Sequence, residues 1–196
     1  CDNPEIIVRT RKFGDALYVF VVNDKREYGS YVGQHGLVME NGLPSRGIVS
    51  LKADAANVYE LTGTQFIVPK RGDDSVMNWP VDLGPCDGKI FMVMPKPLLG
   101  IQLDVPENAT TGNTAKVSAH ITTTQDAPTK AVIPVRVDIR DANGATTEGS
   151  GHYAAENGIV ELELNLAPNE DPGTWEIRVK ELASGMEAVK WMRVGK

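Results

Sequence analysis

The sequence predicts an all-β protein made of two β-sandwiches in tandem, the second of them immunoglobulin-like. Short apolar runs rich in β-branched and aromatic residues recur along the whole chain, and such runs are typical of strands. Turn-forming residues separate them about every ten residues, which is the spacing of a sandwich. No segment keeps an apolar period of 3.6 residues over three turns, so no amphipathic helix is expected.

The sequence predicts a series of short strands in the first half of the chain. Two of its turn signals predict hairpins, a Thr-Gly pair at 62–63 and an Asp-Gly pair at 87–88, because Gly and Asp accept the backbone angles of tight turns. A Glu-Asn-Gly triplet at 40–42 predicts another tight turn, and the polar residues 23–36 predict a long loop. The expected strands are residues 6–11, 17–22, 48–51, 58–61, 65–68, 76–83 and 90–94.

Two prolines, Pro95 and Pro97, mark the expected domain boundary. Proline cannot donate a ladder hydrogen bond, so two prolines in three residues indicate an extended connection rather than a strand. We therefore expect one sandwich over residues 1–95 and an immunoglobulin-like sandwich over residues 96–196.

The second half shows cleaner alternation of apolar and polar residues, which predicts strands with one buried face. About seven strands are expected there, with turns at residues 141–144 and 156–158. The three tryptophans, Trp79, Trp175 and Trp191, lie in strand-like runs and are expected in the core or between the domains. The residues expected to point inward are Val117, Ala119, Ile121, Val135, Val137, Ile139, Val160, Leu162 and Leu164.

Charge and composition exclude some classes of partner. The chain has 196 residues, 41% of them hydrophobic, and a net charge of −6. A negative charge spread along the chain disfavours nucleic acid, which needs a basic face. No apolar run approaches the length of a membrane span. We expect an extracytoplasmic location, secreted, periplasmic or at the cell surface, and a bacterial source.

The start of the chain, at Cys1, leaves two alternatives. We expect a piece cut from a longer polypeptide, whereas a mature lipoprotein acylated at Cys1 would carry a flexible linker that is not seen here. The second cysteine, Cys86, makes one disulfide compatible with the sequence, although the pairing cannot be deduced from it.

No motif in the sequence predicts catalysis, a metal or a cofactor. The histidines His35, His120 and His152 are far apart and lack ligands at zinc spacing. Residues 138–144 resemble a calcium loop, but the expected bidentate glutamate is missing and a hairpin turn explains the pattern. The stretch 149–152 sets Ser150 near His152, yet no nucleophile elbow occurs. We therefore expect no enzyme activity.

One loop contains candidate ligand residues. Tyr28 and Tyr31 stand among glycines, where exposed rings could stack on sugars, and Arg26 and His35 could donate hydrogen bonds beside them. We favour the alternative that one or both tyrosines cap the open end of the sandwich, which leaves this surface without a ligand.

Residues 5–95 resemble the C-terminal β-sandwich that follows the catalytic barrel of many glycoside hydrolases. The resemblance lies in three stretches, residues 16–23, residues 49–51 with 58–63, and residues 81–85 with 87–91. In that family the domain is non-catalytic, supports the barrel and sometimes contacts polysaccharide. The resemblance carries over no catalytic residue, because the barrel is absent from the sequence.

Residues 98–196 resemble the immunoglobulin-like or macroglobulin-type modules of bacterial surface and secreted proteins. The stretches that carry this resemblance are 133–139 with the Asn-Gly pair at 143–144, and the Ala-Pro pair at 167–168 before residues 173–177. Together the two resemblances imply a non-catalytic accessory module of a larger protein, a glycoside hydrolase for instance. The expected partners are the rest of that parent chain and polysaccharide. The alternative is an adhesion or spacer module with no enzyme attached.

Overall fold

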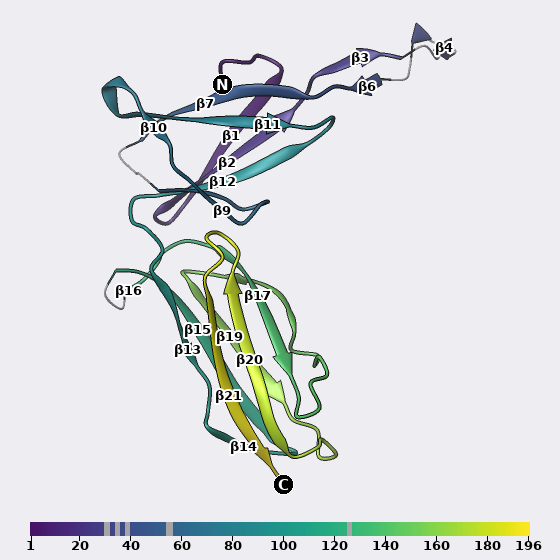
Figure 1. Ribbon diagram of the computed structural model, residues 1–196, viewed down its shortest axis with the longest axis vertical. Coiled ribbons are helices and arrows are strands. Elements are labelled where there is room, and N and C mark those ends of the chain that lie inside the picture. The colour runs from purple at the N-terminus through teal and green to yellow at the C-terminus, as the bar shows by residue number, and fades with distance from the viewer. Residues whose placement is uncertain (30–31, 34–35, 38–39, 54–56, 125–126) are drawn as a thin grey trace. The chain divides into compact units, whose positions relative to one another are not determined.

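A computed structural model describes residues 1–29, 32–33, 36–37, 40–53, 57–124 and 127–196 (Figure 1). These residues form two compact units. The first contains residues 1–12 and 17–95, and the second contains residues 13–16 and 96–196. Both units are built from strands, with one short 3₁₀ turn at Asp73–Ser75 among the described residues. The prediction of an all-β chain of sandwich domains is confirmed.

The first unit places two sheets face to face around one core. One sheet has the order β1-β2-β12-β8-β9 and the other the order β10-β11-β7. Trp79 and Phe91 meet in this core at 5.5 Å between ring centroids, in an edge-on arrangement. The strands of these two sheets are β1 (Ile6–Phe13), β2 (Ala16–Asn23), β7 (Ser45–Lys52), β8 (Asn57–Glu60), β9 (Gln65–Ile67), β10 (Lys70–Arg71), β11 (Val76–Leu83) and β12 (Gly88–Met94).

The N-terminal segment covers the open edge of β7. The carboxylate of Asp2 accepts a hydrogen bond from the Ile48 amide at 2.7 Å, and the Asp2 amide donates to the Ile48 carbonyl. The Asn3 side chain donates to the Arg46 carbonyl at 2.8 Å. An uncovered strand edge invites pairing with another chain, so these contacts occupy donors and acceptors that would otherwise be free.

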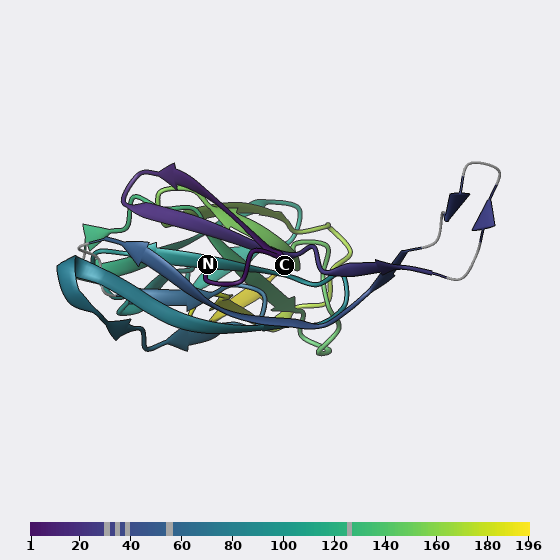
Figure 2. The same ribbon diagram turned by 90° about the horizontal axis from the view of Figure 1, so that it is seen from above.

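Two predictions for residues 23–42 were wrong. The expected long loop contains strands β3 (Arg26–Tyr28), β4 (Val32–Gly33) and β5 (Gly36–Leu37), and the expected turn at 40–42 is strand β6 (Glu40–Gly42). Strand β3 pairs with β6 and β4 pairs with β5. In Figure 2, β3 and β6 run side by side away from the two sheets of the first unit. We call residues 24–43 the ribbon. Cross-strand pairing has overridden the local preference of Asn and Gly for turns.

The hairpin expected at the Asp-Gly pair 87–88 is also not found. Strand β11 pairs with β7 and β10, whereas β12 pairs with β2 and β8. The turn therefore carries the chain from one sheet to the other. Cys86 takes the positive backbone angle in this turn, with φ of 56°. The Thr-Gly hairpin at 62–63 is confirmed, since β8 and β9 pair on either side of it.

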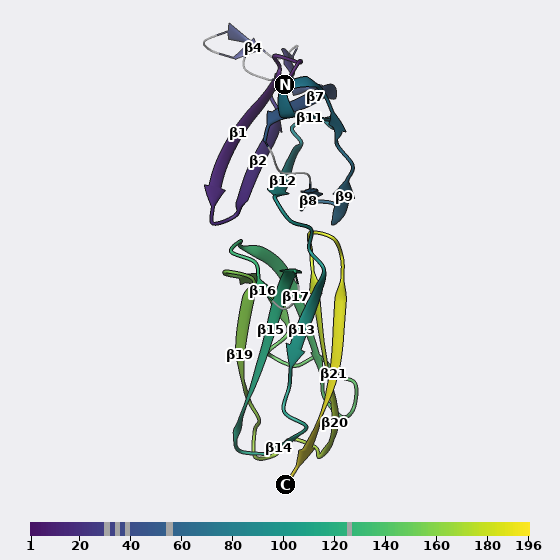
Figure 3. The same ribbon diagram turned by 90° about the vertical axis from the view of Figure 1, so that its left-hand side faces the viewer.

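The second unit has the strand order of an immunoglobulin-like sandwich. One sheet joins β13, β15 and β19, which lie side by side in Figure 3, together with the short strand β16. The other has the order β14-β21-β20-β17-β18. The strands are β13 (Gly100–Asp104), β14 (Asn108–Thr110), β15 (Thr114–Thr124), β16 (Ala127–Pro128), β17 (Ile133–Arg140), β18 (Gly151–Ala155), β19 (Ile159–Asn165), β20 (Gly173–Glu181) and β21 (Glu187–Gly195).

The first stretch of this unit is shared between the two sheets. Strand β13 pairs antiparallel with β15, and β14 then pairs in parallel with the last strand, β21. The sequence gives no sign of β14, because a three-residue strand is too short to show alternation. The segment from β13 to β14 therefore contributes a strand to each sheet and links the first strands of the unit to its last strand, β21.

The predicted alternation is confirmed in the second unit, and Trp191 does not lie in the core. Every second residue of β17 is buried, as is every second residue of β20 from Trp175 to Glu181. Trp79 and Trp175 are buried as expected, with 1% and 3% of their surface exposed, but Trp191 is 61% exposed. The next residue, Met192, is completely buried. Because successive side chains of a strand point to opposite faces, Trp191 must point away from the core.

Candidate ligand-binding surfaces

The ribbon is held at its base by one buried side chain, Asn23. Its amide group donates to the carbonyls of Leu43 and Gly84 at 2.7 and 2.6 Å. Its oxygen accepts hydrogen bonds from the Ser45 hydroxyl at 2.8 Å and from the Lys25 amide at 3.0 Å. A buried amide with all these partners fixes both strands of the ribbon where they leave the sandwich.

Two of the four predicted ligand residues lie in the described part of the ribbon. Tyr28 and Arg26 are both on β3, two residues apart, so they face the same side of the ribbon. The Tyr28 residue is 70% exposed, so it does not cap the sandwich, and Arg26 lies 3.7 Å from the Asp24 carboxylate. Tyr31 and His35 lie outside the described residues. The structure thus places the exposed ring of Tyr28 and the cation of Arg26 on the same side of the ribbon.

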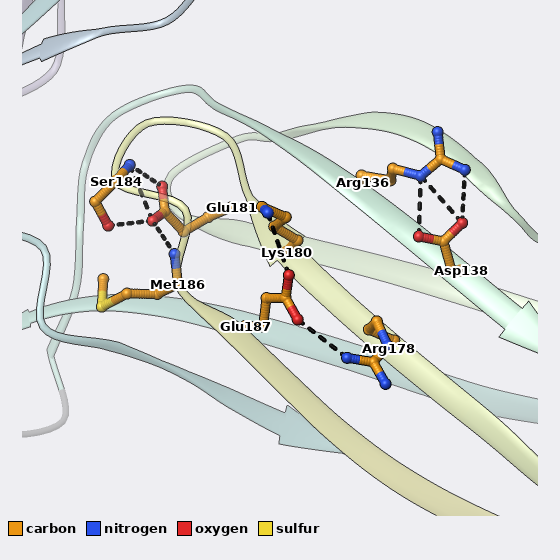
Figure 4. A network of polar contacts seen from close by, with 8 residues as sticks. All are labelled: Arg136, Asp138, Arg178, Lys180, Glu181, Ser184, Met186 and Glu187. Carbon is orange, nitrogen blue, oxygen red and sulfur yellow. Dashed lines mark hydrogen bonds and ion pairs between the residues drawn. The ribbon is translucent and has the colours of Figure 1, made fainter. Parts of the chain in front are cut away.

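A second surface is the outward face of the neighbouring strands β17, β20 and β21, which we call the outer face (Figure 4). On β17, Arg136 donates to both carboxylate oxygens of Asp138, at distances of 2.7 to 3.0 Å. These hydrogen bonds hold the pKa of the Asp138 carboxyl below its ordinary value and raise the pKa of Arg136. The pair is half-exposed, so it contributes order more than stability.

The ion pairs continue across β20 and β21. Arg178 donates to Glu187 at 3.0 Å and to Glu176 at 3.2 Å, and Lys180 lies 3.2 Å from Glu187. Hydrogen bonds from Lys180 and then from Arg178 hold the pKa of Glu187 below its ordinary value. Each long side chain on this part of the outer face is therefore restrained by a partner on its own or the next strand.

Trp191 lies on the outer face beside these ion pairs. The register sets Glu176 directly opposite it on β20, and sets Arg140 of β17 directly opposite Glu176. Arg193 follows two residues after Trp191 on β21, between the buried Met192 and Val194. Arg140 and Arg193 are exposed, and no ion pair joins either of them to another described residue. The exposed Trp191 thus has Arg193 two residues along its own strand, and Arg140 two strands away on the far side of Glu176.

The turn between β20 and β21 is organised by Glu181, which is fully buried. Its carboxylate accepts hydrogen bonds from the amides of Ala183, Ser184 and Met186 at 2.8 to 3.0 Å, and from the Ser184 hydroxyl. Buried carboxylates are tolerated where several donors surround them. Glu181 therefore has a structural role and is not accessible to a ligand.

A polar cavity of about 470 Å³ lies among the loops at one end of the second unit. Asp141 lines it, but its carboxylate already accepts from the amides of Asn143 and Ala145, which supports a turn rather than a calcium loop. In the described ranges, no three His, Cys, Asp or Glu side chains come close enough together to hold a metal ion. Both cysteines, Cys1 and Cys86, are exposed free thiols.

The Ser-His neighbours of residues 149–152 are not arranged for nucleophilic catalysis. The Ser150 hydroxyl donates to the Ile139 carbonyl at 3.1 Å and accepts from the Ile139 amide at 2.8 Å. His152 is exposed and lies opposite Arg136 in the strand register. Ser150 therefore ties its loop to β17.

Sequence reasoning missed Asn23, Glu181 and Trp191. Alternation could have found Trp191, because it shares the parity of Arg193 and not that of the apolar residues Met192 and Val194, whereas Trp175 shares the parity of Ile177. No comparable signal marks Asn23, because Leu43, Ser45 and Gly84 are brought near it by the fold. The partners of Glu181 lie two to five residues further along the chain, but a charged residue in a strand-like run did not indicate a buried carboxylate.

No protein-family model and no curated protein sequence matches the chain. Among solved structures, a Salmonella α-2-macroglobulin matches with 15% identity over 98% of this chain and 12% of its own, with a TM-score of 0.41. The CARDB domain of a Pyrococcus furiosus protein, in complex with di-metal ions, matches at 16% identity over 51% of this chain and 90% of its own, with a TM-score of 0.35. A superoxide reductase from Ignicoccus hospitalis matches at 16% identity over 50% of this chain and 82% of its own, with a TM-score of 0.37.

At such low identity and TM-score these likenesses carry no conclusion about function. The resemblance of the first unit to glycosidase C-terminal domains stays a prediction. In the described part of the chain, no helix has the length and hydrophobicity that crossing a bilayer requires.

Proposed function

We propose that the chain is a non-catalytic accessory module of a larger extracytoplasmic protein, with a glycoside hydrolase as the parent, and that it contacts polysaccharide. The observation that supports polysaccharide contact is Tyr28, a residue 70% exposed on a strand of the ribbon. Covering the apolar face of its ring removes that surface from water, which favours binding. The apolar face of a sugar ring can cover it while the sugar hydroxyls remain in water.

The anchoring of the ribbon supports the same proposal. Asn23 fixes both strands at the base, so less conformational entropy is lost when a ligand binds than would be lost by a free loop. Arg26, on the same side of the ribbon as Tyr28, supplies hydrogen-bond donors next to the ring.

A glycan array tests this proposal with the whole chain, comparing the unchanged protein with Tyr28→Ala and Tyr31→Ala. We expect binding that either substitution weakens at least about tenfold, the effect of losing a central aromatic contact. Glu27→Ala is the matched control, because Glu27 is exposed on the other side of the same strand.

An array without any bound glycan would contradict polysaccharide contact and favour the spacer or adhesion alternative. Binding that all three ribbon variants retain would move the contact away from the ribbon. Sequencing of the parent gene tests the other half of the proposal, since a catalytic barrel encoded before Cys1 is expected.

A further inference from the structure

We propose that the outer face of the second unit is a binding site for an acidic polysaccharide, with Trp191 as the stacking platform and Arg140 and Arg193 as its two cationic contacts. The inference goes beyond the ribbon proposal, because it concerns a different unit and a ligand that bears carboxylate or sulfate groups.

The first argument is the exposure of Trp191. Its neighbour Met192 is fully buried and Trp191 itself is 61% exposed. Strand β21 pairs with β20 at Trp191 and with β14 from Arg193 onward. These ladders hold the backbone that carries the ring. A flat ligand can therefore stack on it at little entropic cost.

The second argument is charge. The outer face carries five cations, Arg136, Arg140, Arg178, Lys180 and Arg193, and three anions, Asp138, Glu176 and Glu187. Five minus three leaves a local charge of +2, whereas the whole chain carries −6. The three anions are all engaged by Arg136, Arg178 or Lys180. The positive charge that is left over belongs to Arg140 and Arg193, which make no ion pair with another described residue and lie near Trp191 in the register.

The third argument is spacing. Arg140 is two strands away from Trp191, a backbone separation of about 10 Å, and Arg193 is two residues along the strand, about 7 Å away. Their guanidinium groups can each take a carboxylate or sulfate in a two-point contact. An acid group on either side of a stacked sugar ring would meet them. A neutral polysaccharide would use the indole but gain nothing from the two arginines.

The test measures binding of polygalacturonate and chondroitin sulfate, with dextran and laminarin as neutral probes, by isothermal titration of the whole chain. We expect the acidic probes to bind, Trp191→Ala to weaken them at least about tenfold, and Arg140→Gln or Arg193→Gln to weaken them about fivefold to tenfold. Binding should also weaken as salt is raised from 50 to 500 mM, because exposed charges are screened.

Arg9→Gln is the matched control. It removes the same charge from an exposed position in the first unit and should leave the affinity unchanged. The Trp191 and arginine positions are exposed, so the variants should fold, which thermal unfolding verifies.

Three outcomes would overturn the inference. If neutral and acidic probes bind equally and Arg140→Gln has no effect, the outer face does not select an acidic polysaccharide. The ribbon proposal would be unaffected by that result. Loss of binding in Tyr28→Ala but not in Trp191→Ala would assign the sugar to the ribbon. Binding of no glycan at all would overturn both proposals.

Discussion

The ribbon and the outer face both expose an aromatic ring on a β-strand, but they hold it by different means. Tyr28 lies on a strand that pairs only with β6, and the ribbon depends on the buried Asn23 at its base. Trp191 lies on β21, which pairs with β20 and β14, and ion pairs restrain the side chains beside it. The difference indicates a ribbon that can adapt to a ligand and an outer face that is already ordered before binding.

Removing the buried carboxylate of the second unit should have the largest effect on stability. Glu181→Ala leaves three backbone amides of the β20–β21 turn without acceptors, so we expect the free energy of unfolding to fall by about 3 kcal/mol. Glu181→Gln, which keeps one acceptor oxygen, should cost roughly half of this. Urea unfolding followed by circular dichroism measures both.

The matched control is Glu161→Ala, at an exposed position of β19, which should change stability by less than about 0.5 kcal/mol. Equal effects of Glu181→Ala and Glu161→Ala would show that the turn does not depend on its carboxylate. The order of the β20–β21 turn, at one end of the outer face, would then need another explanation.

The corresponding change in the first unit should have a smaller effect. Asn23→Ala removes the acceptor of the buried Ser45 hydroxyl and frees both strands of the ribbon at its base, so we expect a loss of about 2 kcal/mol. Asn41→Ala, exposed on the ribbon itself, is the control. Hydrogen exchange of the ribbon amides should accelerate in Asn23→Ala and not in Asn41→Ala. Unchanged exchange would refute the anchoring role.

The smallest effect expected is a pH dependence of the outer face. The pKa values of Asp138 and Glu187 lie below their ordinary values in the folded chain. The stability they contribute is therefore present above about pH 4 and is lost as the pH falls through their lowered pKa values. Because the pairs are exposed, the change should be small.

Asp138→Asn checks this sign. The variant should unfold at lower urea concentration than the unchanged protein at pH 7, and the difference should shrink as the pH falls through the lowered pKa of the Asp138 carboxyl. A difference that stays the same as the pH is lowered until the carboxyl is protonated would show that the Arg136–Asp138 pair acts through packing rather than charge.

The fold class could be predicted because period-two alternation is a local signal. It placed Val135, Val137 and Ile139 inward, and all three are fully buried. The pairing of the strands could not be predicted. The Asp-Gly turn after β11 is compatible both with a hairpin in one sheet and with a crossing to the other sheet. Residues 40–42 were assigned to a turn for a related reason, since their strand exists only through pairing with β3.

The candidate sites were less predictable than the fold. The sequence singled out Tyr28 by its glycine-rich surroundings, but it gave Trp191 the same interpretation as Trp175. Trp191 and Trp175 differ only in whether they alternate in step with the apolar residues of their strands. That comparison can be made only after the strands have been identified. Asn23 binds groups 20 to 61 residues away, which sequence spacing does not reveal. Glu181 binds groups within five residues, but its burial depends on the sheets packed around it.

Acrylamide quenching of tryptophan fluorescence tests the central claim most directly, because Trp79 and Trp175 are buried and Trp191 is exposed. We expect one readily quenched indole, lost in Trp191→Phe, and we expect polygalacturonate to protect it from the quencher while dextran does not. Polygalacturonate that binds without protecting this indole, or a readily quenched signal that survives in Trp191→Phe, would contradict the account.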